Sequence, residues 1–176
     1  MRIIVTKPNP SWPDDFLVES ERIRKALGYA VVAVHHIGST AIREIFAKPV
    51  IDILLVVTDL QSLDQSELSM INLGYEAKGE FGIPRRRYFR RNSDAGVRTH
   101  QVHAFQLGSP HIERHLAFRD YMNSNPAAAL AYSDLKQQLA LAHPTDMSAY
   151  MDGKDAFVKQ HEAIALKVVR TERGSL

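Results

Sequence analysis

The sequence lacks cysteine, long apolar runs and any marked excess of charge of one sign. Without cysteine it has no disulfides, no thiolate metal ligands and no cysteine nucleophile, which is consistent with a reducing compartment. No apolar run approaches the about 18 residues of a membrane span, and residues 1–8 turn polar too early for a secretory signal. We therefore expect a cytoplasmic protein without a membrane partner.

The net charge of +2 is too small to indicate a nucleic-acid partner by itself. The 176 residues are 45% hydrophobic and 24% charged, which is typical of a soluble globular protein. A chain of this length forms one ordinary domain, and no repeat or clear linker divides it, so we predict a single domain over residues 1–176. Nothing in the composition indicates an oligomeric state.

Caps, turn residues and apolar periodicity divide the chain into elements. Helices are predicted at residues 11–27, 63–73, 109–123, 125–142 and 145–170, and strands at 29–36, 50–58, 75–80, 85–91 and 97–107. The last two strands flank a turn-rich segment and form a hairpin. This order predicts an α+β domain with a small mixed sheet and a helical C-terminal half.

Asp52 stands alone in the apolar run 50–57. An ionised carboxylate in a buried strand is costly unless it is paired or binds a metal. Strand alternation places Val50, Asp52 and Leu54 on one face, so Leu54 occupies the position of a second carboxylate. We predict that Asp52 is catalytic and holds one hydrated Mg²⁺, with substrate phosphates supplying the other ligands. The alternative is a structural carboxylate bonded to backbone or to an arginine.

The tripeptide Gly38-Ser39-Thr40 follows the apolar run 30–37 and precedes the strand of Asp52. Glycine permits a tight turn and the close approach of a ligand, and backbone N–H groups with hydroxyls bind anions. We predict that this turn holds a phosphate. The alternative is a simple cap of a helix over residues 41–46.

Two further residues flank these elements. Lys48 precedes the strand of Asp52, where its ammonium could meet a phosphate or pair with Asp52, or remain a solvated loop lysine. His35 and His36 are adjacent and point to opposite faces, and His36 is the better site candidate because it lies directly before the turn.

The predicted hairpin carries six arginines, Arg85, Arg86, Arg87, Arg90, Arg91 and Arg98. Alternation separates Arg85, Arg87 and Arg91 from Arg86 and Arg90. One set could bind phosphates through bidentate contacts, and we predict Arg87 as a catalytic residue that stabilises developing charge. The interleaved aromatic residues leave a nucleic-acid surface open, which the small net charge disfavours.

His100 and His103 lie on the second hairpin strand at an odd spacing, so a regular strand sends them to opposite faces. One could be a general base or metal ligand and the other a packed or surface histidine. Without knowing which face is the site, we keep both as catalytic candidates.

Polar residues of the helical half complete the ligand-binding candidates. They are Arg119, Tyr132, Lys136 and Lys154. Tyr132 and Lys136 are four residues apart and share a helix face. The alternative for each is an ordinary surface residue.

These residues resemble the GrpB family. The motif pair is HIGSTA at residues 36–41 and AKPVIDI at residues 47–53, and further matching segments follow in the family's order at 12–16, 82–91, 99–103, 115–121 and 153–157. The resemblance covers nearly the whole chain. It implies a nucleotidyltransferase-like fold, in which a Gly-Ser turn grips nucleotide phosphates and carboxylates on the next strand bind Mg²⁺.

On this resemblance, Gly38 and Ser39 match the phosphate turn and Asp52 matches the first carboxylate. Leu54 replaces the second, and no Asp or Glu lies between residues 97 and 107 to supply a third. Similar domains are fused to dephospho-coenzyme A kinase in some bacteria, which implies a coenzyme A or nucleotide connection.

Two functions remain open. The first is an Mg²⁺-dependent transfer of a nucleotidyl or phosphoryl group from a nucleoside triphosphate to a small molecule. The second is a non-catalytic module that binds a nucleotide or a coenzyme A precursor. In both, the expected partner is a small phosphate-bearing ligand and nucleic acid is unlikely.

Overall fold

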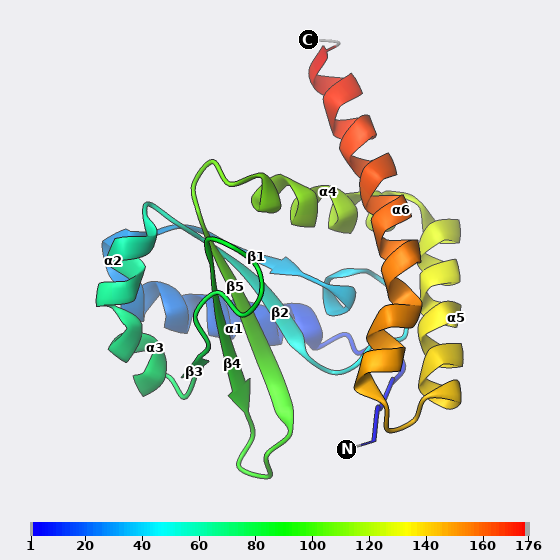
Figure 1. Cartoon of the computed structure of the whole chain (residues 1–176), viewed down its shortest axis with the longest axis horizontal. Coiled ribbons are helices and arrows are strands. Elements are labelled where there is room, and N and C mark those ends of the chain that lie inside the picture. Colours follow the sequence, from blue (N-terminus) through cyan, green and yellow to red (C-terminus); the bar gives the residue numbers. More distant parts are fainter. Residues whose placement is uncertain (1, 175–176) are drawn as a thin grey trace.

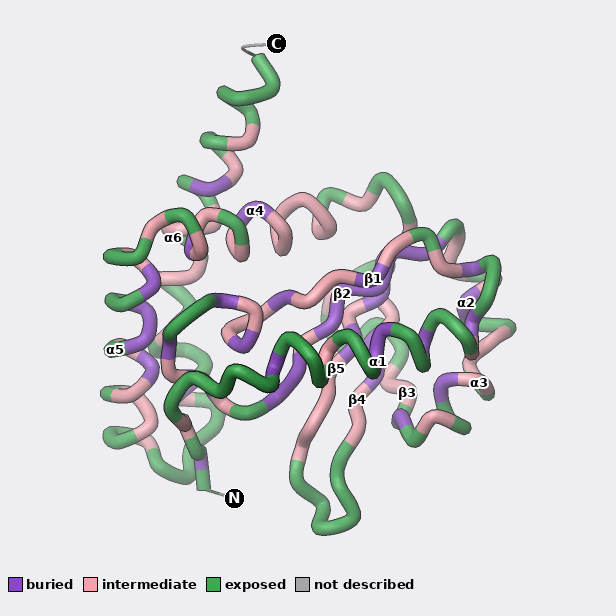
Figure 2. The backbone as a smooth tube through the Cα atoms, turned by 180° about the vertical axis from the view of Figure 1, so that it is seen from behind, coloured by how far each residue is buried: buried purple, intermediate pink, exposed green. Residues whose placement is uncertain are grey.

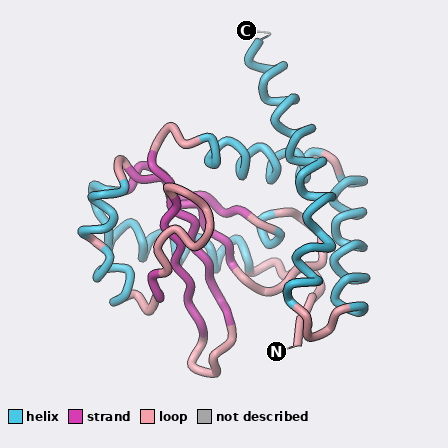
Figure 3. The backbone as a smooth tube through the Cα atoms, viewed as in Figure 1, coloured by secondary structure: helices cyan, strands magenta, loops and turns pink. Residues whose placement is uncertain are grey.

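The computed structural model describes residues 2–174 (Figures 1 and 3). Its helices are α1 (Trp12–Leu27), α2 (Leu60–Gln65), α3 (Glu67–Asn72), α4 (Pro110–Ser124), α5 (Pro126–Ala142) and α6 (Met147–Gly174). Its strands are β1 (Val31–Ile37), β2 (Ile51–Val57), β3 (Glu76–Ala77), β4 (Arg86–Asn92) and β5 (Arg98–Gln106). The predicted α+β class with a helical C-terminal half is confirmed. Among the described residues no helix combines the length and hydropathy that a bilayer crossing requires.

The strands form one mixed sheet in the order β1-β2-β5-β4-β3. Strands β2 and β5 are parallel, and the other neighbours are antiparallel. The register pairs Asp52 with Ile37 on one side and with Gln101 on the other, and it pairs Leu54 with His103. Asp52 therefore lies beside the end of β1, where the Gly38 turn begins.

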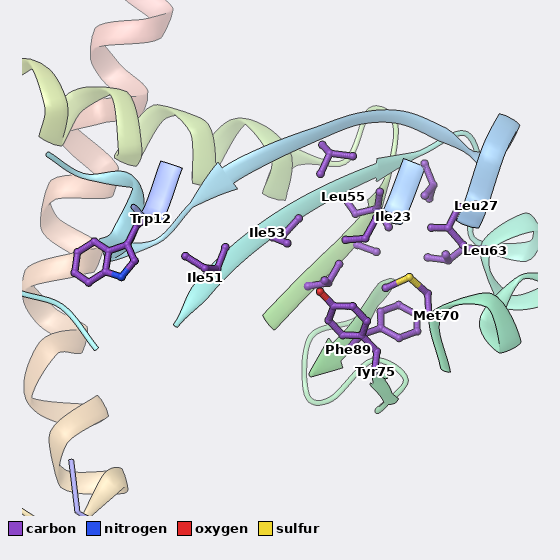
Figure 4. Close-up of a cluster of buried hydrophobic side chains, with 14 of the residues drawn as sticks. Trp12, Ile23, Leu27, Ile51, Ile53, Leu55, Leu63, Met70, Tyr75 and Phe89 are labelled. Atoms are coloured by element: carbon purple, nitrogen blue, oxygen red, sulfur yellow. The ribbon is translucent and has the colours of Figure 1, made fainter. Parts of the chain in front are cut away.

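One face of the sheet, here called the α1 face, carries the main core (Figure 4). Ile51, Ile53 and Leu55 of β2 point to this face, because strand residues two apart share a face. Helix α1 covers them with Ile23 and Leu27, and α2 and α3 complete the cluster. At about 25 cal/mol per Å² of apolar area, this burial is the main stabilising contribution on this side.

The opposite face, here called the Asp52 face, is covered differently. Leu54, Val56 and Phe105 pack there with side chains of α4 such as Leu116. Beyond this apolar patch, towards the start of β2, Asp52 takes the next position on the same face. The Asp52 face thus changes from packed to polar along a single strand.

The helices α4, α5 and α6 form the C-terminal half. A second core joins Met122 of α4 and Tyr132 of α5 to Ile45 in the segment before β2. Gly153 lets α6 approach α5 closely, since a Cβ there would lie 3.0 Å from Leu139 Cδ1. Figure 2 shows the exposed C-terminal end of α6 projecting beyond α4. The packing fixes residues of α5 and α6 beside the start of β2.

Several local predictions were wrong. The strand expected over residues 75–80 is confined to Glu76–Ala77, and a short 3₁₀ turn, Gly28–Ala30, replaces the start of the strand expected over residues 29–36. The helix expected over residues 63–73 is two short helices, because Asp59 caps the first by accepting a 2.7 Å hydrogen bond from the Ser62 N–H, and Ser66 interrupts the run. The helix considered over residues 41–46 is absent; a short 3₁₀ turn, Ser39–Ala41, stands at the Gly-Ser motif.

Candidate functional site

Gly38 and Asp52 are in direct contact. Gly38 has φ +71°, and a Cβ at this position would lie only 2.8 Å from Asp52 Cβ. Glycine therefore meets both the backbone conformation and the close approach. The Asp52 side chain is 25% exposed, and its polar neighbour within 4 Å is His103. No arginine or backbone hydrogen bond is recorded for this carboxylate among residues 2–174, so the structural alternative for Asp52 lacks its expected partner.

His103 shares the Asp52 face, with Nε2 at 3.7 Å from Asp52 Oδ1. Its Nδ1 lies 3.3 Å from Arg86 Nη1. Because a guanidinium only donates, Nδ1 accepts and the proton of a neutral ring lies on Nε2. Arg86 is held in place by donating to the carbonyls of Glu80 and Phe81 at 3.1 and 2.6 Å. His103 thus presents an N–H towards Asp52 rather than a free lone pair for a metal.

His100 lies on the α1 face, which confirms that the two histidines point to opposite sides. Its Nδ1 is 3.0 Å from Arg91 Nη2. Burial, followed by the charge of Arg91, lowers the pKa of His100 to about 4. His100 is therefore a neutral packed residue, and the prediction that it acts with Asp52 is corrected.

Arg87 also lies on the α1 face, where it forms a bidentate ion pair with Asp64 of α2 at 2.6 and 2.8 Å. The alternation of the arginines was predicted correctly, but the other set shares the face of Asp52. Arg86 of that set and the neighbouring Tyr88 point to the Asp52 face, and Tyr88 pairs with His103 in the register of β4 and β5. The prediction that Arg87 acts at Asp52 is therefore corrected.

His36 and Thr40 have protein partners. His36 Nε2 is 2.9 Å from Thr40 Oγ1, and its ring stacks on Phe16 of α1. The Thr40 hydroxyl donates to the Val50 carbonyl at 3.2 Å, so it accepts from His36. Burial lowers the pKa of His36 to about 4, which keeps the ring neutral. We assign both residues to the support of the turn rather than to ligand contact.

Arg119 of α4 lies apart from the lysines described next. It donates to the His36 carbonyl at 3.1 Å and pairs with Asp120. With Trp12 and Asn123 it lines a separate cavity of about 550 Å³ behind the turn. Arg119 thus lines this cavity together with His36 and Thr40, the residues that support the Gly-Ser turn.

Three lysines, Lys48, Lys136 and Lys154, gather around two tyrosines, and we call them the lysine cluster. Lys48 Nζ and Lys154 Nζ lie 5.6 and 5.0 Å from the ring centre of Tyr150. Lys136 Nζ lies 4.5 Å from the ring centre of Tyr132. The Tyr132 hydroxyl hydrogen-bonds Ser39, which joins the cluster to the Gly-Ser turn.

The cluster is short of negative charge. Lys136 is only 1% exposed, and its Nζ has no hydrogen-bond partner in the described part of the chain. Burial, followed by the charges of Lys154 and Lys48, lowers the pKa of Lys136 to about 7. Burial and Lys48 lower the pKa of Lys154 to about 8, against the opposing effect of Asp52. A buried ammonium without a counter-ion is costly, so the cluster favours an anion.

Two neighbours of this site were missed from the sequence. Tyr150 lies between two of the lysines, and it stands four residues before Lys154 on α6. The spacing rule that paired Tyr132 with Lys136 would have found it. Arg86 was placed in the correct set but was not chosen as a site residue, because the sequence does not tell which strand face is open.

The residues fit one divalent cation but not two. No group of three or more His, Asp or Glu able to hold a metal occurs among residues 2–174. Leu54 is fully buried where a second carboxylate would stand. Asp52 alone could contribute one carboxylate to an Mg²⁺ that is otherwise held by phosphate oxygens and water, which is a usual arrangement for Mg²⁺.

Comparison with known proteins identifies the family to which the chain belongs. A family model described as GrpB protein matches residues 2–163. The UPF0157 protein YqkA of Bacillus subtilis is 44% identical over 154 residues, which are 88% of this chain and 44% of YqkA. The chain thus spans less than half the length of that relative. A crystal structure of conserved protein GrpB from Enterococcus faecalis has 42% identity and a TM-score of 0.90, and the match covers 94% of this chain and 99% of that one.

Two more distant proteins extend the comparison. A dephospho-CoA kinase of Mycobacterium bovis is 28% identical over 174 residues, which span 84% of this chain and 42% of the kinase. The Cid1 poly(U) polymerase, solved with Mg 3'-dATP bound, has a TM-score of 0.55 at 12% identity and covers 85% of this chain with 49% of its own. This likeness shows the fold alone. The chain belongs to the GrpB family and has a nucleotidyltransferase-like fold.

Proposed function

We propose that the protein binds a nucleoside triphosphate on the Asp52 face and transfers a nucleotidyl or phosphoryl group to a small molecule. The observation that carries the proposal is the meeting of one open carboxylate, the Gly38-Ser39 turn and the lysine cluster at the start of β2. These groups come from four separate parts of the chain. Their shared property is an affinity for phosphate and for the cation that accompanies it.

Each group has a distinct role in this proposal. The acceptor oxygen attacks a phosphorus atom, and the bond to the leaving phosphate breaks. Ser39 and the lysine cluster hold the phosphate oxygens and stabilise the charge that develops on them. His103, with Nε2 at 3.7 Å from Asp52 Oδ1, would orient that carboxylate beside the bound phosphates. Mg²⁺, carried in with the phosphates and held by Asp52, would neutralise further charge at the reacting group.

In this proposal the lysines neutralise the phosphate charge that a second cation, held by two further carboxylates, would otherwise neutralise. The sequence predicts Arg87 as the residue that stabilises developing charge and Arg119 as a ligand-binding residue, but Arg87 pairs with Asp64 on the α1 face and Arg119 binds the His36 carbonyl. Lys136 and Lys154 are better candidates, because Lys136 lies against Tyr132, which adjoins Ser39, and Lys154 lies within the influence of the Asp52 charge.

A second candidate is a binding module without catalysis, for a nucleotide or a coenzyme A precursor. The buried Leu54 at the second carboxylate position favours it, because weak metal binding makes turnover slow. The similarity to part of a dephospho-CoA kinase also supports it. In either case the proposed partner is a small phosphate-bearing molecule rather than a nucleic acid.

Calorimetry with MgATP, MgGTP and coenzyme A precursors, followed by product analysis, tests both candidates. Asp52→Asn keeps the shape of the side chain and removes its charge, and Asp94→Asn in the exposed hairpin turn is the matched control. We expect Asp52→Asn to lower turnover at least about 100-fold, with no change for the control.

The outcomes separate the candidates. Binding that is independent of Mg²⁺, with no product from any nucleotide, favours the binding module. Turnover that survives Asp52→Asn unchanged contradicts the catalytic assignment. Absence of binding for every ligand in the panel contradicts both.

A further inference from the structure

Lys136 is the most unusual charged residue of the molecule. It lies on α5, is 1% exposed, and offers three N–H donors of which none has a protein acceptor within residues 2–174. Lys136 Nζ lies 4.5 Å from the centre of the Tyr132 ring. A cation–π contact of this kind compensates only part of the cost of burying an ammonium.

The groups that face Lys136 come from three elements. Tyr132 belongs to the same helix, Lys154 comes from α6, and Lys48 comes from the segment before β2. The charges that act on Lys136 are those of Lys154 and Lys48, and both are positive. The charge of Asp52 raises the pKa of Lys48 and of Lys154 against the effect of burial. Asp52 is not among the charges that shift the pKa of Lys136.

We propose that the lysine cluster binds the terminal phosphates of a polyphosphate without a metal ion, and that Lys136 is uncharged before the anion enters and takes up a proton with it. The inference rests on the proposed function, because it assigns the anion to the same ligand. No covalent bond changes. The proton comes from solvent and ends on Lys136 Nζ, and the anion supplies the acceptor that this nitrogen lacks in the protein.

The charges decide the direction of the effect. At a pKa of about 7, Lys136 is mostly neutral at pH 8.5. A polyphosphate brings several negative charges beside it, and an opposite charge within about 4–6 Å favours the protonated form. Lys154, whose pKa is lowered to about 8, is also largely neutral at pH 8.5 and adjoins the same anion. Binding at pH 8.5 therefore takes up between about one and two protons, and each of the two lysines lowers the affinity by up to about tenfold per pH unit above its own pKa.

Calorimetry with ATP at pH 8.5 in EDTA, repeated in two buffers of different ionisation enthalpy, measures this proton directly. The ATP phosphates are then almost fully ionised, so the ligand cannot supply the proton. We expect the wild type to bind without metal and to take up between about one and two protons. Lys136→Met should bind at least about tenfold more weakly at pH 7 and take up about one proton fewer than the wild type, because only the contribution of Lys154 remains. Lys25→Met, an exposed lysine of α1, should match the wild type.

Metal-free binding without proton uptake, or equal uptake by Lys136→Met, overturns the inference and leaves the proposed function standing. Binding only with Mg²⁺ also overturns it. If ATP does not bind at all, the proposed function fails for this nucleotide, and the charge state of Lys136 is read from stability alone. In that case an unfolding free energy difference between wild type and Lys136→Met that stays constant from pH 7 to 10 overturns the assignment of an uncharged lysine.

Discussion

The two faces of the sheet treat buried charge in opposite ways. On the α1 face Glu19 is almost fully buried, accepts from Tyr75 at 2.9 Å and pairs with Arg91 at 2.8 Å. On the Asp52 face the carboxylate is open, and Lys136 Nζ is buried without a hydrogen-bond partner within residues 2–174. Buried charges that pair with one another stabilise the fold, whereas a buried charge without a counter-ion favours the binding of a charged ligand. The α1 face thus has paired buried charges that stabilise the fold, and the Asp52 face is the one on which we propose the ligand site.

The largest effect should follow from breaking the closed network. Glu19→Ala leaves Arg91 and Tyr75 without their acceptor, and removing one partner of a buried pair costs about 3–5 kcal/mol. We expect the free energy of unfolding in urea to fall by this amount. Ligand affinity of the folded fraction should be unchanged, and a loss of affinity would show that the two faces are coupled.

Lys136→Met should act in the opposite direction. The mutation removes an ammonium whose burial is costly, so at pH 7 it should raise the free energy of unfolding by on the order of 2–4 kcal/mol. The pKa of Lys136 is lowered from 10.5 to about 7, so the unfolded chain binds more protons between these values and wild-type stability rises with pH.

The advantage of Lys136→Met should therefore shrink steadily from pH 7 to 10. Urea unfolding at several pH values measures it, with Lys25→Met as the control. A variant less stable than the wild type at pH 7 would mean that the lysine already has a counter-ion in the protein.

Gly38→Ala tests how the open face is built. The new Cβ would meet Asp52, and alanine is strained at φ +71°. We expect a loss of about 1–3 kcal/mol in unfolding free energy, together with weaker nucleotide binding because Asp52 is displaced. Gly96→Ala in the hairpin turn has a similar positive φ but open space around it, so it should lose stability without losing affinity.

Arg87→Met should have the smallest effect. The ion pair with Asp64 is partly exposed, and such pairs contribute about 0–1 kcal/mol. Turnover and nucleotide affinity should equal those of the wild type. A marked loss of turnover would restore Arg87 to the catalytic group and contradict the division between the two faces.

The sequence predicted most of the fold because its signals are local. Caps, glycines and apolar runs located the helices and the hairpin, whereas the break at Ser66 and the short turn after Gly38 escaped, since local hydrogen bonds that the apolar pattern does not reveal determine both. Alternation correctly separated His100 from His103. It could not tell which face was open, because that depends on where α1 packs.

The lysine cluster shows the same limit for the site. Lys48, Lys136 and Lys154 were each selected from the sequence, but nothing local indicates that they meet. Their meeting depends on Gly153, which brings α6 against α5, and on the segment before β2, which packs on Tyr132. The burial of Lys136, and the lack of a hydrogen-bond acceptor for its Nζ within residues 2–174, depend on tertiary packing and cannot be predicted from the local sequence.

The most direct test of the Asp52 face as the ligand site is a crystal structure with Mg²⁺ and a non-hydrolysable ATP analogue. We predict phosphates between Ser39 and the lysine cluster, with an oxygen within hydrogen-bond distance of Lys136 Nζ and the reacting phosphate facing Asp52. A nucleotide bound elsewhere, with Lys136 still lacking an acceptor, would contradict this assignment.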